Sequence, residues 1–213
     1  MNPKNIQTKG LVNYWPFNSH IQDVIGGRHL YSGKKVGFST DRFGRPSSAL
    51  NLKGGYYNFP PGNYFPGSFT LTAWIFQKSL ANWQRLFDFS NGPGKEMVNL
   101  AMTFGTTGIP VFELTNSANQ VKLSLEANTN MVANKWYHIA ITVNSTDLLT
   151  KFYINATLCN SDYSTGSFSA YRHKNYLGFD SYESSISDSK IDELKIFNRV
   201  LTQKELLVEM NSF

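Results

Sequence analysis

The residues best suited to chemistry in this sequence are aromatic side chains in segments that we expect to form loops. Exposed aromatic rings stack on sugar rings, and neighbouring polar groups hydrogen-bond the hydroxyls. Trp83 stands two positions before Arg85, which makes this pair the first candidate for such a contact. Most of the 31 aromatic residues must form the core, so we single out four candidate ligand-binding residues: Trp83, Arg85, Tyr56 and Tyr57.

Groups for catalysis are poorly placed in the sequence. Glycoside hydrolysis needs two carboxylates about 5 to 10 Å apart across a cleft. Asp192 and Glu193 are adjacent, and neighbouring residues of a strand point to opposite faces. The single cysteine, Cys159, has no partner motif, and no Gly-x-Ser-x-Gly elbow occurs. We predict that the chain is not an enzyme, while a carboxylate pair from two separate strands stays open.

The composition predicts one globular β-rich domain. Of the 213 residues, 41% are hydrophobic and only 16% are charged, so a packed core is possible and global disorder is excluded. No apolar run approaches the ~20 residues of a membrane-spanning helix, so we expect no membrane insertion. Residues 1–53 carry eight Lys or Arg against two acids. This excess fits a solvated basic surface, and because no recognition motif accompanies it we expect no nucleic-acid partner.

The elements that would position these residues are mostly strands. Short apolar runs separated by Gly, Pro, Asn and Ser clusters predict about a dozen of them, with a hairpin turn at residues 53–55 between strands at 48–52 and 56–59. One helix is expected over residues 203–210, because Thr202 and Glu205 have the spacing of a capping box. We expect residues 1–10 to be a flexible lead and residues 11–213 to be a single domain.

Several stretches resemble laminin-G-like domains of the concanavalin A-like lectin/glucanase superfamily. They occur in the family's order over most of the chain, and the closing stretch is similar to the family's most recognisable signature. The stretches are residues 11–18 (LVNYWPFN), 43–52 (FGRPSSALNL), 68–75 (SFTLTAWI), 135–140 (KWYHIA), 152–155 (FYIN) and 191–202 (IDELKIFNRVLT).

This resemblance implies an all-β fold, a two-sheet antiparallel jelly-roll sandwich of concanavalin A-like type with a short C-terminal helix. It also implies that the first and last strands pair. The superfamily contains lectins, adhesion modules and glucanases, so the fold leaves the function open. The glucanase string Glu-x-Asp-x-x-Glu is absent. We expect a non-catalytic binding or adhesion module for a glycan or an extracellular protein, at the cell surface or outside the cell, as part of a longer secreted precursor. A structural, self-associating domain or a divergent glycoside hydrolase are the alternatives.

The resemblance also implies a calcium site. Laminin-G-like domains often bind calcium between an Asp after the first strand and an Asp of the closing strand, here Asp23 and Asp192, with Asn18 as a further oxygen ligand. Asp192 has the strand parity of Leu194 and Ile196, which predicts a carboxylate on the core side. In the alternative, Asp192 caps backbone N–H groups or pairs with an arginine such as Arg28, and no metal binds. Both interpretations stay open.

Overall fold

The computed structural model describes residues 8–183 and 187–212, and this part of the chain is all-β with one short helix. Residues 1–7 of the expected flexible lead lie outside it. Its elements are β1 (Leu11–Trp15), β2 (Tyr31–Ser39), β3 (Ala49–Asn58), β4 (Phe69–Gln77), β5 (Arg85–Ser90), β6 (Val98–Ala101), β7 (Val111–Thr115), β8 (Val121–Glu126), β9 (Trp136–Val143), β10 (Leu149–Ile154), β11 (Thr157–Tyr163), β12 (Lys174–Leu177), β13 (Ser187–Phe197) and α1 (Gln203–Asn211).

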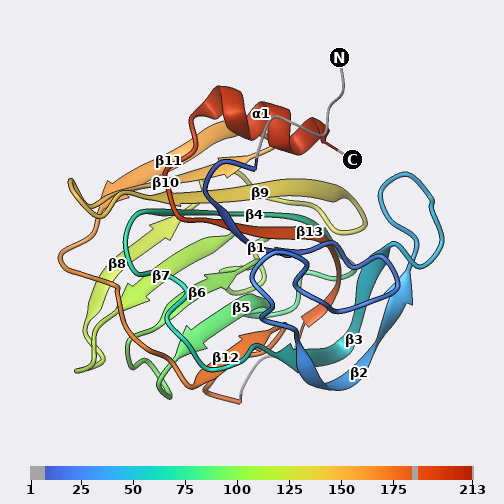
Figure 1. Cartoon of the computed structure of the whole chain (residues 1–213), viewed down its shortest axis with the longest axis horizontal. Coiled ribbons are helices and arrows are strands. Elements are labelled where there is room, and N and C mark those ends of the chain that lie inside the picture. Colours follow the sequence, from blue (N-terminus) through green and yellow to red (C-terminus); the bar gives the residue numbers. More distant parts are fainter. Residues whose placement is uncertain (1–7, 184–186, 213) are drawn as a thin grey trace.

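The strands form an antiparallel sandwich of two layers (Figure 1). We call β11-β10-β9-β4-β13, with β1 beside β13, the back sheet, and β12-β5-β6-β7-β8 the front sheet. β3 pairs with β13 along one half and with β12 at its end, so the two layers are one continuous sheet rather than two separate ones. β1 pairs with β13, which confirms the expected pairing of the first and last strands.

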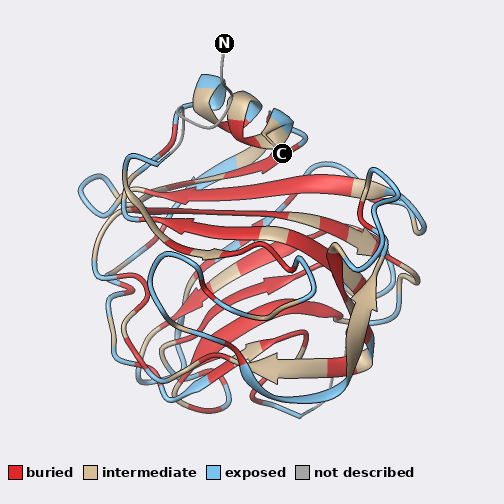
Figure 2. Ribbon diagram, turned by 45° about the vertical axis from the view of Figure 1, so that its right-hand side comes forward, coloured by how far each residue is buried: buried red, intermediate tan, exposed pale blue. Residues whose placement is uncertain are grey.

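The core lies between the two layers (Figure 2). In β4, the alternate residues Phe69, Leu71, Ala73 and Ile75 point into it and are almost completely buried. The opposite side of β4 is buried at Thr70 and Thr72, next to a smaller apolar cluster below α1 that includes Phe197 and Leu206, whereas Trp74 and Phe76 are partly exposed. This partial burial of the second face explains why β4 has no charged residue.

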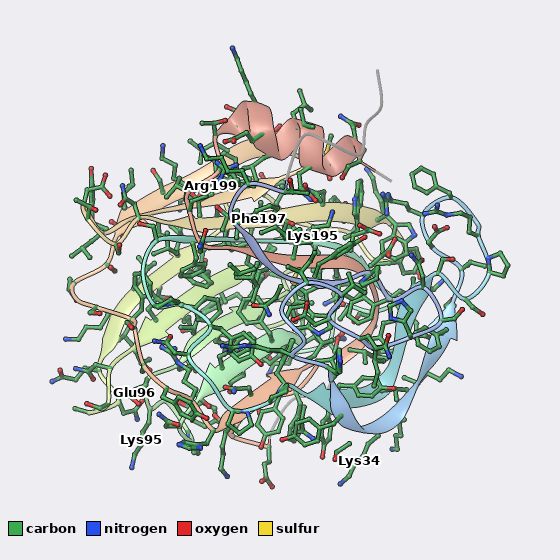
Figure 3. All side chains as sticks on the ribbon, in the orientation of Figure 1. Lys34, Lys95, Glu96, Lys195, Phe197 and Arg199 are labelled. Carbon is green, nitrogen blue, oxygen red and sulfur yellow. The ribbon has the colours of Figure 1, made fainter. Side chains whose placement is uncertain are left out.

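The helix α1 begins where the sequence predicts. Thr202 accepts a hydrogen bond from the Glu205 backbone, and the Glu205 carboxylate accepts one from the Thr202 backbone, which completes the capping box. Lys195 of β13 pairs with Glu209 of α1 beside Phe197 (Figure 3), and this buried ion pair ties the helix to the back sheet. Within the described residues, α1 is too short and too polar to cross a membrane, and no other helix could do so.

One expected feature is wrong: the chain makes no hairpin turn at residues 53–55. β3 continues through this segment from Ala49 to Asn58. Gly54 has a positive φ of 65°, and the pairing with β13 shifts by one residue between Lys53 and Gly55. The glycines therefore accommodate a bulge that bends β3 from one layer to the other. Two further strands, β2 and β11, were not predicted because both are largely polar and exposed.

Candidate functional site

A row of polar side chains crosses the outer face of the front sheet. Tyr176 of β12 stands opposite Asp88 of β5, Asp88 opposite Asn99 of β6, Asn99 opposite Glu113 of β7, and Glu113 opposite Ser124 of β8. Because strand residues alternate between faces, the residues next to this row point inward and form core. The sequence pattern therefore places carboxylates and amides together on one surface.

Two carboxylates of this row are held in a partly desolvated setting. Asp88 is completely buried, and its Oδ2 accepts hydrogen bonds from the backbone N (2.7 Å) and the Oγ (2.9 Å) of Ser181. Burial raises the pKa of Asp88 to about 6. Burial also raises the pKa of Glu113, although the positive charge of Arg85 acts to lower it. Within the described residues, Asp88 Oδ1 and Asn99 Oδ1 have no hydrogen-bond partner.

The predicted pair Trp83 and Arg85 lies at one end of this face. The Arg85 guanidinium carbon is 4.8 Å from the centre of the Trp83 ring, and Arg85 Nε is 3.4 Å from Asp180 Oδ2. Trp83 has a positive φ of 54°, and its partly exposed ring meets the edge of Phe104 at 5.0 Å. Arg85 itself is buried. It therefore supports the Trp83 ring from behind, and the tryptophan is the member that can touch a ligand.

Tyr182 completes the rim of this surface. Its ring is 46% exposed, and its hydroxyl lies 2.7 Å from the point where a Cβ on Gly94 would stand. Burial of the hydroxyl, followed by the charges of Asp88 and Glu113, raises the pKa of Tyr182, so the phenol lies near both carboxylates. We call Trp83, Arg85, Asp88, Glu113 and Tyr182 the front-face site.

The two other predicted ligand-binding residues, Tyr56 and Tyr57, lie on opposite sides of β3. Tyr56 lies on the outer side of the front layer, stacked on Phe179 at 4.6 Å and edge-on to Tyr176 at 5.9 Å, next to the polar row. Tyr57 points to the opposite side, where it packs against the core and burial raises its pKa. Tyr57 is therefore not brought to the front-face site, because consecutive strand residues face opposite ways.

Asp88, Glu113 and Tyr182 are site residues that sequence reasoning did not assign. Asp88 stands between two phenylalanines, and Glu113 stands between Phe112 and Leu114. The signal available in the sequence was a single carboxylate inside an otherwise apolar strand. Such a carboxylate must face away from the core and so marks the outer face of the strand. Tyr182 lies in a loop, and no pattern in the sequence connects that loop to the sheet.

Asp23, the first expected calcium ligand, is surrounded by N–H donors. Its carboxylate accepts hydrogen bonds from Asn13 Nδ2 (2.6 Å) and from the backbone N of Tyr14, Ile25, Gly26 and Arg28 (2.9 to 3.1 Å). Although burial opposes the effect, these bonds lower the pKa of Asp23. The carboxylate caps a loop, and so many donors leave little room for a cation.

Asp192, the second expected ligand, lies on the other side of β13 from the core, so the expected core-side position is wrong. Three steps of β13, from Asp192 to Lys195, stand opposite two steps of β4, and Glu193 has a positive φ of 53°. This bulge reverses the parity. Asp192 Oδ2 lies 2.8 Å from Arg42 Nη1, so an arginine is its partner, although it is Arg42 and not Arg28.

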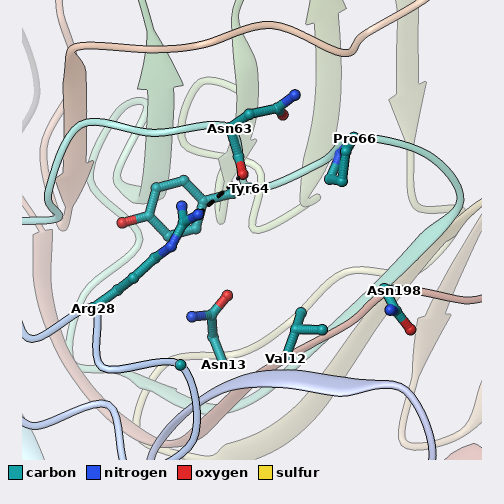
Figure 4. A pocket seen from close by; sticks show the side chains of 8 residues that line it. Val12, Asn13, Arg28, Asn63, Tyr64, Pro66 and Asn198 are labelled. Carbon is teal, nitrogen blue, oxygen red and sulfur yellow. Dashed lines mark hydrogen bonds between the residues drawn. The ribbon is translucent and has the colours of Figure 1, made fainter.

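The surroundings of Asp23 do not fit calcium, which takes six to eight oxygen ligands. A cavity of about 300 Å³ beside it is lined by Arg28, whose guanidinium reaches over Tyr64 and donates to the Asn63 carbonyl (Figure 4). Asn18 is exposed. In residues 8–183 and 187–212, no group of three or more His, Cys, Asp or Glu side chains could hold a metal ion. The N–H donors around Asp23 and the arginine beside Asp192 fit the alternative in which no metal binds.

Comparisons with known proteins agree with this architecture. The binding domain of Paraclostridial Mosquitocidal Protein 1 has a TM-score of 0.74 and 17% identity, over 95% of this chain and 52% of that one. Domain 4 of AbnA, an extracellular GH43 arabinanase from Geobacillus stearothermophilus solved with arabinotriose, has a TM-score of 0.72 and 17% identity, over 94% and 98% of the two chains. The botulinum neurotoxin serotype G binding domain has a TM-score of 0.71 and 15% identity, over 94% and 50%.

These likenesses concern the fold, and the chain spans about half the length of the toxin binding domains it matches. No curated protein matches the chain. A laminin G family model, described as the concanavalin A-like lectin/glucanases superfamily, matches residues 51–207. This match covers most of the chain, from within β3 to the start of α1, so the chain belongs to the concanavalin A-like lectin/glucanases superfamily.

Proposed function

We propose that this chain is a non-catalytic module that binds a neutral glycan at the front-face site, in an extracellular setting. The observation that carries the proposal is the Trp83 ring, partly exposed and supported from behind by Arg85, next to the carboxylate row. A fixed aromatic platform beside hydrogen-bond acceptors is the arrangement that binds the apolar face and the hydroxyls of a sugar.

The charge of the site favours a neutral ligand. Three carboxylates, those of Asp88, Glu113 and Asp180, lie near the cation Arg85, so the negative charge around Trp83 should repel uronic and sialic acids. Of the basic residues in the N-terminal third, Arg28 and Arg42 lie beside Asp23 and Asp192, away from this site. Lys34 is exposed on β2, and its Nζ lies 5.7 Å from the centre of the Tyr56 ring, next to the polar row. Similar folds occur in a domain solved with arabinotriose and in toxin binding domains, which supports a glycan partner and an extracellular role.

The test is a set of thermal melts with neutral and with uronic oligosaccharides. A ligand that binds only the folded state adds about 2.7 kcal/mol of stability at a hundredfold excess over its Kd. We expect a neutral oligosaccharide to raise the Tm of the protein, and a uronic one of equal length to have no effect. Stabilisation by uronic acids alone would contradict the proposal.

One observation favours a second candidate, a divergent glycoside hydrolase. Asp88 and Glu113 lie on β5 and β7, with β6 between them. Neighbouring strands are about 4.8 Å apart, so the two residues are separated by two such spacings, a distance close to the carboxyl separation of inverting enzymes. Asp88 is completely buried under Ser181, so we place binding first. Release of reducing sugar that disappears in Glu113→Gln would establish the hydrolase.

A further inference from the structure

A second aromatic surface lies on the outer face of the back sheet, remote in the topology from the front-face site. Trp74 of β4 pairs with His138 of β9, and Phe76 of β4 pairs with Trp136 of β9. The two tryptophans are therefore diagonal neighbours on the same face of the sheet. Residues in this relation lie roughly 7 to 8 Å apart across the two strands. Both are partly exposed, unlike most residues of β4 and β9.

This pair forms part of a cavity of about 300 Å³, which we call the helix-side groove. The end of α1 supplies one group of lining residues, and the segment between β2 and β3 supplies another. The lining consists of Arg42, Phe43, Trp74, Trp136, Met210 and Asn211. The volume is at the lower end of the range for ligand pockets, which suits one or two small rings.

Arg42 disfavours a cationic ligand in the groove. Its guanidinium carbon lies 4.4 Å from the centre of the Phe43 ring and 4.7 Å from the centre of the Trp74 ring, so each of these two rings already has a cation beside it. The charge is in turn balanced by Asp192, 2.8 Å from Nη1, and Nη2 donates to the Ser212 carbonyl at 3.1 Å. A neutralised Arg42 gives an acidic ligand little attraction.

The groove also has polar groups next to its aromatic rings. Asp192, Trp74 and His138 stand side by side on β13, β4 and β9. Both polar members are buried, and within the described residues Asp192 Oδ1 and His138 Nδ1 have no hydrogen-bond partner. Asn211 brings an amide to the lining. Aromatic faces with adjacent polar atoms fit a ring that has both C–H faces and hydroxyl edges.

We infer that the helix-side groove is a second carbohydrate-binding site, which holds one neutral saccharide ring against Trp74 and Trp136. The inference rests on the groove's own residues and not on the front-face site. The two sites lie on opposite outer faces of the sandwich, so the module can engage two glycan chains, or two segments of one chain.

The experiment is a titration of the ¹⁵N-tryptophan-labelled chain, observed through its four indole N–H signals. Trp15, which is buried and donates to the Arg28 carbonyl at 3.0 Å, is the internal reference. Trp83 reports on the front-face site, and Trp74 and Trp136 report on the groove. Single Trp→Phe variants assign the signals. The probes are neutral trisaccharides including arabinotriose, a galacturonic acid trimer, and N-acetyl-phenylalanine amide as an apolar non-sugar.

We expect a neutral sugar to shift the Trp74 and Trp136 signals in a saturating manner, in the wild type and in Trp83→Ala alike. In Trp136→Ala, the remaining Trp74 signal should titrate with an affinity weaker by about tenfold or more. Shifts of Trp83 alone would overturn the second site and leave the proposed function standing. Shifts of Trp74 and Trp136 only with the uronic trimer or the phenylalanine amide would also overturn it. If no probe moves any of the three reporters, both proposals fail.

Discussion

The guanidinium carbon of Arg85 lies 4.8 Å from the centre of the Trp83 ring, and its Nε lies 3.4 Å from a carboxylate oxygen of Asp180. One buried side chain thus joins an aromatic platform on the loop before β5 to a carboxylate on the loop after β12. We expect this link to help orient the Trp83 ring, because the tryptophan lies outside the strand and has a left-handed backbone conformation. Arg85 should therefore matter for the fold and, through Trp83, for ligand binding.

Replacing Arg85 should destabilise the protein strongly. In Arg85→Met, the buried carboxylate of Asp180 loses its cation, and removing one partner of a buried pair costs about 3 kcal/mol or more. Urea unfolding measures the change. The control is Asp188→Asn, which breaks the half-exposed pair with Lys78 and should cost under about 1 kcal/mol. Equal effects of the two substitutions would show that the Arg85 pair has no special role.

Asp88 should make stability rise as the pH falls from about 7 towards 4. Its pKa is raised to about 6 in the folded state, above the ordinary 3.8, so the folded protein binds the proton more tightly than the unfolded one. This difference amounts to about 3 kcal/mol at most, and it vanishes in Asp88→Asn. Unfolding free energies of wild type and variant across this range give the comparison. Parallel curves would show that Asp88 titrates normally.

Calcium should have no effect on the melting temperature. The Asp23 carboxylate is already occupied by five N–H donors, and Asp192 is paired with Arg42. Melts in millimolar calcium and in chelator should therefore coincide. A higher Tm in calcium that disappears in Asp192→Ala would instead establish the metal site that the family resemblance implies.

Sequence patterns were informative where local chemistry decides the structure. The capping box of Thr202 and Glu205 placed α1. Sequence patterns failed where a bulge changes the parity of a strand. The extra residue at Glu193 moves Asp192 to the outer face, and the bulge at Gly54 turns an expected hairpin into a bend.

The candidate site was only partly predictable for a related reason. Trp83 and Arg85 are close in sequence, so their pairing is a local property. Asp88 and Glu113 belong to one surface only because β5, β6 and β7 are neighbours in the sheet. This strand order is set by packing of the whole sheet. Tyr56 and Tyr57 look equivalent in the sequence, but the pleat sends one to each face.

The most direct test of the account is the affinity of a neutral oligosaccharide for Trp83→Ala, measured by calorimetry beside the wild type. The matched control is Tyr163→Ala, which removes an aromatic ring that is 62% exposed on β11, outside the front-face site. We predict that Trp83→Ala weakens binding by about tenfold or more, and that Tyr163→Ala leaves it unchanged. Wild-type affinity in Trp83→Ala, for every neutral sugar that binds, would contradict the front-face site.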